Sequence, residues 1–127
     1  IHVEVPDFVN IVDAHSSIDR LEKEIKKKTN VEITIHIDPI STDKDKVDLI
    51  NDQVQQILNQ INEDYYMRNF RLAETKSKLI VIFDLIIPSH INPHDFSAIK
   101  QNVVKKLIEV YPEYDVVIDN VLLEEIK

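Results

Sequence analysis

A short alternating stretch near the start of the chain most constrains the fold. In residues 31–39, VEITIHIDP, aliphatic side chains alternate with polar ones. Because successive side chains of a β-strand point to opposite faces, this stretch predicts a strand with one aliphatic and one polar face. His36 and Asp38 share the polar face. Residues 1–5 alternate in the same way and place His2 on the polar face of a second strand.

A helical pattern separates the two predicted strands. Its apolar residues recur every three or four positions, as on one face of an α-helix: Ile11, Ala14, Ile18, Leu21 and Ile25. Asn10, with Asp13 three residues later, predicts the helix start, and the lysines of residues 26–28 suit the negative end of the helix dipole. His15 flanks the apolar stripe. We therefore expect a β-α-β unit with an aliphatic underside and polar groups on its rim.

The same arrangement recurs later in the chain. A strand-ending proline, Pro6, lies 32 positions before Asp38, and a second one, Pro88, lies 31 positions before Asp119. Residues 43–87 add a helix and a strand ahead of the second copy. The sequence therefore predicts an α+β protein with two tandem ferredoxin-like lobes of order α-β-β-α-β, the first lacking its leading helix and strand.

The predicted lobes meet at residue 40. Residues 1–40 form the partial first lobe, which holds the candidate metal site, and residues 41–127 form the second. Thr42 and Asp45 have the spacing of a helix start. The elements expected in the second lobe are a helix over 47–62, a strand over 66–72, a turn over 74–77, a central strand over 79–87, a helix over 93–110, a strand over 114–121 and a tail over 122–127. A start within a strand pattern, without an initiator Met, indicates a fragment of a longer protein.

Composition excludes several classes of function. Glycine is absent, so the phosphate-cradling loops and dinucleotide fingerprints that require it are excluded. Cysteine is absent too, which excludes disulfides, cysteine zinc sites and thiol catalysis. The formal charge of −8 repels nucleic acid and anionic lipid and attracts cations. No apolar run approaches the roughly 20 residues of a membrane span, and no catalytic triad or carboxylate pair is evident, so we do not expect an enzyme.

Four side chains of the first lobe are candidate metal ligands: His2, His15, His36 and Asp38. Divalent transition ions bind imidazole and carboxylate, and need three or four such ligands about 2.0–2.2 Å from the ion. The spacing leaves open the alternative of a hydrogen-bonded His–Asp pair on a solvated face. His90, His94 and Asp95 form a second histidine group, which solvent exposure and the dipole of the following helix explain without a metal.

Five short motifs occur in the predicted first lobe: residues 1–5 (IHVEV), 13–15 (DAH), 18–19 (ID), 21–22 (LE) and 35–39 (IHIDP). Together they resemble the cytoplasmic C-terminal domain of cation diffusion facilitator transporters, and the likeness covers nearly the whole chain. Residues 64–88 and 104–119 are similar to an extension found in a bacterial branch of that family. The motifs there are residues 68–71 (RNFR), 83–88 (FDLIIP), 111–114 (YPEY) and 115–118 (DVVI).

The resemblance implies a homodimer that binds divalent cations near its interface, at the cytoplasmic face of the cell membrane. It also implies an upstream transmembrane domain of the same protein. The ligand positions of the family correspond to His2, His15, His36 and Asp38, and a further family ligand lies on a preceding strand that is absent here. In the second lobe only Asp119 repeats a ligand type, so we expect that lobe to be structural or to extend the dimer surface. Zinc is the default ion, with manganese, cobalt, cadmium and iron as alternatives.

The predicted function is therefore a cytosolic metal-sensing and dimerisation domain of a divalent cation efflux transporter. A cation between acidic protomers would offset their repulsion and bias their arrangement. We expect no binding of nucleic acid and no direct binding of lipid by this chain. Two alternatives stay open. One is a stand-alone ferredoxin-like regulatory module that binds a small molecule or a protein without metal, and the other is a family member whose site has decayed to leave a dimerisation domain.

Overall fold

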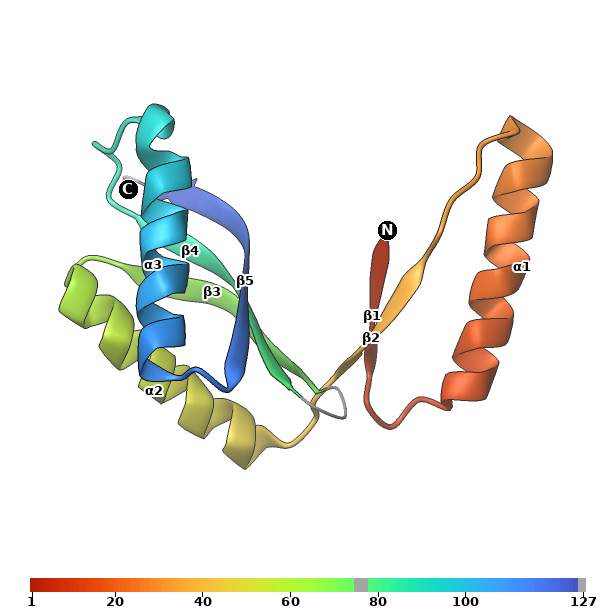
Figure 1. Ribbon diagram of the computed structural model, residues 1–127, viewed down its shortest axis with the longest axis horizontal. Coiled ribbons are helices and arrows are strands. Elements are labelled where there is room, and N and C mark those ends of the chain that lie inside the picture. The colour runs from red at the N-terminus through yellow and green to blue at the C-terminus, as the bar shows by residue number, and fades with distance from the viewer. Residues whose placement is uncertain (75–77, 126–127) are drawn as a thin grey trace. The chain divides into compact units, whose positions relative to one another are not determined.

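The computed structural model describes residues 1–74 and 78–125, except for the side chain of residue 11. It is an α+β protein, as predicted (Figure 1). Its helices are α1 (Ile11–Thr29), α2 (Lys44–Ile61), the short 3-10 helix η1 (Pro93–Asp95) and α3 (Phe96–Val110). Its strands are β1 (His2–Pro6), β2 (His36–Ile40), β3 (Tyr66–Glu74), β4 (Leu79–Ile87) and β5 (Tyr114–Leu123). In the part of the chain that the structure describes, no helix is long and apolar enough to cross a membrane.

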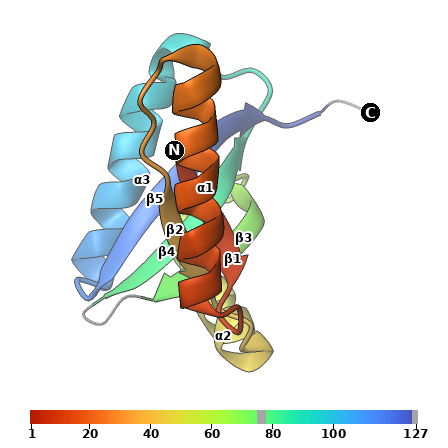
Figure 2. The same cartoon turned by 90° about the vertical axis from the view of Figure 1, so that its right-hand side faces the viewer.

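The chain divides into two compact units, residues 1–42 and residues 43–127. In the first unit β1 and β2 pair in parallel. Helix α1 lies along one side of this pair (Figure 1 and Figure 2). The predicted start of α1 is confirmed, because the Asn10 side chain accepts hydrogen bonds from the backbone N–H groups of Val12 and Asp13. The helix ends at Thr29, and the next residue, Asn30, closes the last turn with a left-handed backbone (φ 57°).

The second strand is shorter than its alternating pattern predicts. Strand β2 begins at His36, and residues 31–35 have no regular structure. Two hydrogen bonds join this end of β2 to Ile1: the N-terminal amino group donates to Thr34 O at 3.2 Å, and the N–H of His36 donates to Ile1 O at 2.8 Å. Regular pairing of the two strands begins at His2 and His36. Pro39, predicted to end the strand, lies inside it opposite Val5.

In the second unit β4 is the central strand. It runs antiparallel to β3 and parallel to β5. Its residues from Val81 to Ile87 are all buried, which confirms the prediction of a central strand covered on both faces. The expected tail was partly wrong, because Leu122 and Leu123 belong to β5, where backbone pairing with β4 extends the strand. Residues 75–77 of the expected turn and residues 126–127 of the expected tail lie outside the described residues.

The core of the second unit lies between one face of the sheet and the helices α2 and α3. Phe83 is fully buried at its centre, against Leu58 of α2 and Leu107 of α3. Burying each such side chain contributes about 1.5–3 kcal/mol. Both helices join this one cluster, so both cover the same side of the sheet. Their opposite sides face away from it.

The other face of β4 carries a buried carboxylate, Asp84, with only 5% of its surface exposed. The strand pairing is irregular on both sides of it, between Arg68 and Arg71 in β3 and in the pairing of β4 with β5. Asp84 accepts hydrogen bonds from the side-chain amides of Asn69 at 2.8 Å and Asn120 at 3.0 Å. The two irregular strands therefore each supply one donor to the same buried group.

We expect Asp84→Ala to lower the free energy of unfolding by about 2–3 kcal/mol, because two amide donors lose a charged acceptor. Urea denaturation followed by circular dichroism measures this. Asp115→Ala is the matched control: Asp115 lies on β5, is 46% exposed in its side chain and pairs with Lys78 at 2.9 Å. Its loss should cost less than about 1 kcal/mol. Equal costs for the two variants would contradict a stabilising role for the buried carboxylate.

Candidate metal centre

Three of the four predicted ligands lie side by side on the β1–β2 pair. The parallel register places His2 directly beside His36, and their ring centroids are 5.1 Å apart. The Nδ1 atom of His2 lies 3.2 Å from Oδ2 and 3.4 Å from Oδ1 of Asp38. His2 thus stands between an imidazole and a carboxylate. The prediction that these residues share one polar face agrees with this geometry.

The environment of this group is open to solvent. The side chain of His2 is 67% exposed and that of Asp38 is 31% exposed. An ion pair at such a position is screened by water and adds little to stability. Residues held together at an exposed position with little gain in stability are available to a ligand.

His15 lies apart from this group. It is exposed in the first half of α1, and within the described residues no hydrogen bond, ion pair or ring contact joins it to His2, His36 or Asp38. Over residues 1–74 and 78–125, no three His, Asp or Glu side chains gather closely enough to hold a metal ion. The donor types fit a zinc-like ion, while a complete ligand set requires donors beyond the contacts made in this chain.

The second histidine group also lies on an exposed surface. His90 follows β4, and His94 and Asp95 belong to η1. Asn92 starts η1 by accepting a hydrogen bond from the backbone N–H of His94 at 3.0 Å. Asn92 thus begins the short helical turn that contains His94 and Asp95.

A contact that the sequence did not predict ties β1 to the end of β2. Thr42 donates to Asp7 from its hydroxyl at 2.6 Å and from its backbone N–H at 3.3 Å, while the N–H of Asp7 donates to Ile40 O at 2.8 Å. The Thr42 hydroxyl holds the pKa of Asp7 below its ordinary value. Thr42 was expected to start α2, but Asp43 does so, by accepting from the N–H of Lys46.

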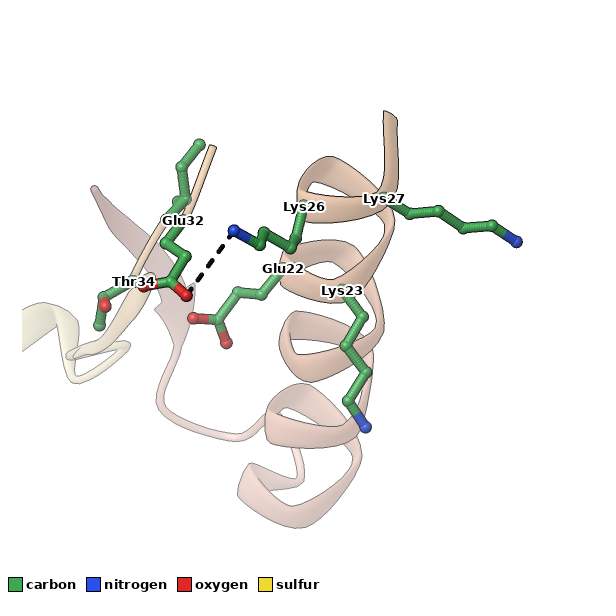
Figure 3. A pocket seen from close by; sticks show the side chains of 7 residues that line it. Glu22, Lys23, Lys26, Lys27, Glu32 and Thr34 are labelled. Atoms are coloured by element: carbon green, nitrogen blue, oxygen red, sulfur yellow. Dashed lines mark ion pairs between the residues drawn. The ribbon is translucent and has the colours of Figure 1, made fainter. Parts of the chain in front are cut away.

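A pocket of about 390 Å³ opens between α1 and residues 32–34 (Figure 3). Lys26 and Glu32 form an ion pair across it at 3.8 Å, and Glu22 accepts a hydrogen bond from the N–H of Ile35 at 3.3 Å. Lys23 and Lys27 point away from it in Figure 3. Charges of both signs line this pocket, so it favours neither anions nor cations.

Residues 1–40 match the family model of the cation efflux protein, cytoplasmic domain. The predicted resemblance is confirmed over this segment. It comprises β1, α1 and β2, and so includes His2, His15, His36 and Asp38. No curated protein and no solved structure matches the chain. The similarity of residues 64–88 and 104–119 to a bacterial branch of the family stays a prediction.

The contact between Asp7 and Thr42 leads to a pH-dependent prediction. We expect Thr42→Val to raise the pKa of Asp7 toward its ordinary value of 3.8, because the variant loses the hydroxyl donor. A carboxyl group with a lowered pKa stabilises the fold above its unfolded pKa, and this contribution is lost as the pH falls through the folded pKa. The variant should therefore be less stable than the parent near neutral pH, and the difference should shrink below about pH 4.

Carboxyl carbon NMR titration of Asp7 measures this change directly. Thr42→Ser, which keeps the hydroxyl, should leave the pKa of Asp7 low. If the valine and serine variants titrate alike, the side-chain hydrogen bond is not the cause of the shift.

Proposed function

We propose that this chain is the cytoplasmic metal-sensing and dimerisation domain of a divalent cation efflux transporter, with zinc as the default ion. The match of residues 1–40 to the cation efflux cytoplasmic domain carries this proposal. In the proposed setting, an upstream membrane domain of the same protein moves the cation. The present chain responds to cation concentration as a homodimer at the cytoplasmic face.

We also propose that both units are variants of one ferredoxin-like fold. The order α2-β3-β4-α3-β5 of the second unit supports this, and β1-α1-β2 corresponds to its last three elements. The apolar stripe of α1 is more exposed than that of α3, as this correspondence predicts. Leu21 on the apolar stripe of α1 is 44% exposed, while Val103 and Leu107 on the stripe of α3 are 0% and 1% exposed. In the second unit α2 and β3 supply the cover that the first unit lacks.

The proposed cation site is the group formed by His2, His36 and Asp38, with His15 as a fourth donor. The contact of His2 Nδ1 with Asp38 supports it. Two donor atoms 3.2 Å apart can both lie about 2.0–2.2 Å from a single ion. Because these side chains make only pairwise contacts, the remaining ligands would come from movement of α1 or from a second copy.

Ligands shared between copies would couple cation binding to the dimer arrangement. Each chain has a formal charge of −8, so two copies repel each other. A divalent ion held between them reduces this repulsion and favours the arrangement in which both copies contribute ligands. The cation concentration is thereby converted into a change of protomer arrangement.

We expect the purified chain to bind zinc, and the double variant His36→Ala/Asp38→Ala to bind it far more weakly. The loss should exceed the roughly 10–100-fold effect typical of outer-shell changes, because two direct donors are removed. Isothermal titration calorimetry with zinc, manganese and cobalt salts measures this. Binding at 100 times the dissociation constant should also stabilise the fold by about 2.7 kcal/mol.

His90→Ala/His94→Ala is the matched control, because it removes two exposed histidines outside the proposed site and should leave binding unchanged. Equal losses in both double variants would indicate nonspecific binding by surface histidines. Absence of binding by the parent chain would favour the metal-free regulatory module. A dimer unaltered by metal in sedimentation, without binding, would indicate a decayed site.

A further inference from the structure

The outer face of α2 is acidic. The inner side of this helix supplies Ile50, Val54, Ile57 and Leu58 to the core. At 3.6 residues per turn, the opposite side carries Asp45, Asp48 and Asp52, all of them exposed. Leu49 lies among these carboxylates and is 59% exposed. The outer face of α2 thus carries three carboxylates beside one exposed apolar side chain, and Lys46, one turn before Leu49, is paired with Glu74.

The outer face of α3 has the opposite character. A groove of about 430 Å³ lies along this helix, lined by Ser97, Lys100, Gln101, Val104 and Lys105. Lys100 and Lys105 are exposed, and neither has an ion-pair partner among the described residues. Val104, partly buried, gives the groove an apolar surface between the two cations. In a chain of formal charge −8, α3 carries one acidic residue, Glu109, against three lysines.

These two faces complement each other in charge. If α2 of one copy lies on α3 of another, the carboxylates of α2 can pair with Lys100 and Lys105 while Leu49 meets Val104. Within one chain the two helices pack side by side on one face of the sheet. Their outer faces therefore lie next to each other on one surface. A two-fold axis through that surface can bring α2 of each copy onto α3 of the other, so that both contacts form together.

We propose that this surface of residues 43–127 is a self-association site, in which α2 of one copy docks on α3 of a second copy. The partner is a second copy because the complementary acidic and basic faces occur on the same unit. Two acidic chains repel each other overall. The local pairing of acidic α2 with basic α3 therefore determines the register in which two copies can dock. The contact contains no proposed cation ligand, so it is independent of the site in residues 1–40.

Charge reversal on the full chain tests this proposal. Sedimentation velocity is run with a chelator present, so that no cation contributes, and at an ionic strength where the Debye length is about 10 Å or more. The parent should self-associate. Lys100→Glu/Lys105→Glu and Asp48→Lys/Asp52→Lys should each raise the dissociation constant by about tenfold or more, because both reciprocal contacts become repulsive. Leu49→Ala should also weaken association, without any change of charge.

Mixing the two charge-reversed variants is the decisive measurement. In the mixed pair the acidic α3 of one chain meets the basic α2 of the other, and the remaining contact keeps its original signs. A heterodimer should therefore form at concentrations where each variant alone is monomeric, as native mass spectrometry detects. Failure of the mixture to associate overturns the proposal, and so does a parent chain that is monomeric under these conditions.

Two control variants carry the same changes of net charge elsewhere. Lys23→Glu/Lys27→Glu reverses two exposed lysines of α1, and Glu63→Lys/Asp64→Lys reverses two exposed acids that follow α2. Both should associate as the parent does. If they weaken association as much as the variants of α2 and α3, net charge rather than docking is responsible and the proposal fails. Circular dichroism establishes that each variant keeps its fold.

Discussion

The parallel backbone pairing of β1 with β2 is the interaction on which the candidate site depends. It places His2 beside His36 and, through the alternation of the strands, Asp38 on the same face. The contact between Asp7 and Thr42 closes the far end of the pair, so the register is held at both ends. A shift by one residue would turn the polar face toward α1 and separate the imidazoles.

Both units contain elements in the order β-α-β, and the second has α2 and β3 ahead of them. In the second unit α2, α3 and the strands β3, β4 and β5 contribute to an apolar core around Phe83. In the first, Ile35 at 9% exposure is the buried apolar side chain among those the structure describes, and Phe8 is 77% exposed. The second unit can maintain its shape through its own packing. The first leaves apolar side chains such as Phe8 exposed.

Much of the fold followed from periodicity, because hydrophobic patterns report which face is buried. The β-α-β elements, the cap at Asn10 and the buried central strand were predictable for this reason. What the sequence did not reveal depends on partners distant in the chain. Residues 31–34 have a strand pattern but no strand beside them, and the contacts of Asp84 need irregular pairing on both neighbouring strands. At the candidate site, strand alternation predicted that His36 and Asp38 would lie beside His2. No local sequence pattern defines the distance between His15 and these residues.

The two positive-φ residues of the described chain have a consequence for the unfolded state. Asn30 at 57° and Asn69 at 56° occupy a region that glycine usually fills, and the sequence contains no glycine. Asparagine tolerates this region, and at position 69 its amide also reaches Asp84, which a glycine could not do. A chain without glycine samples fewer backbone conformations before it folds. Its turns are thus made with a smaller loss of conformational entropy than glycine turns would require.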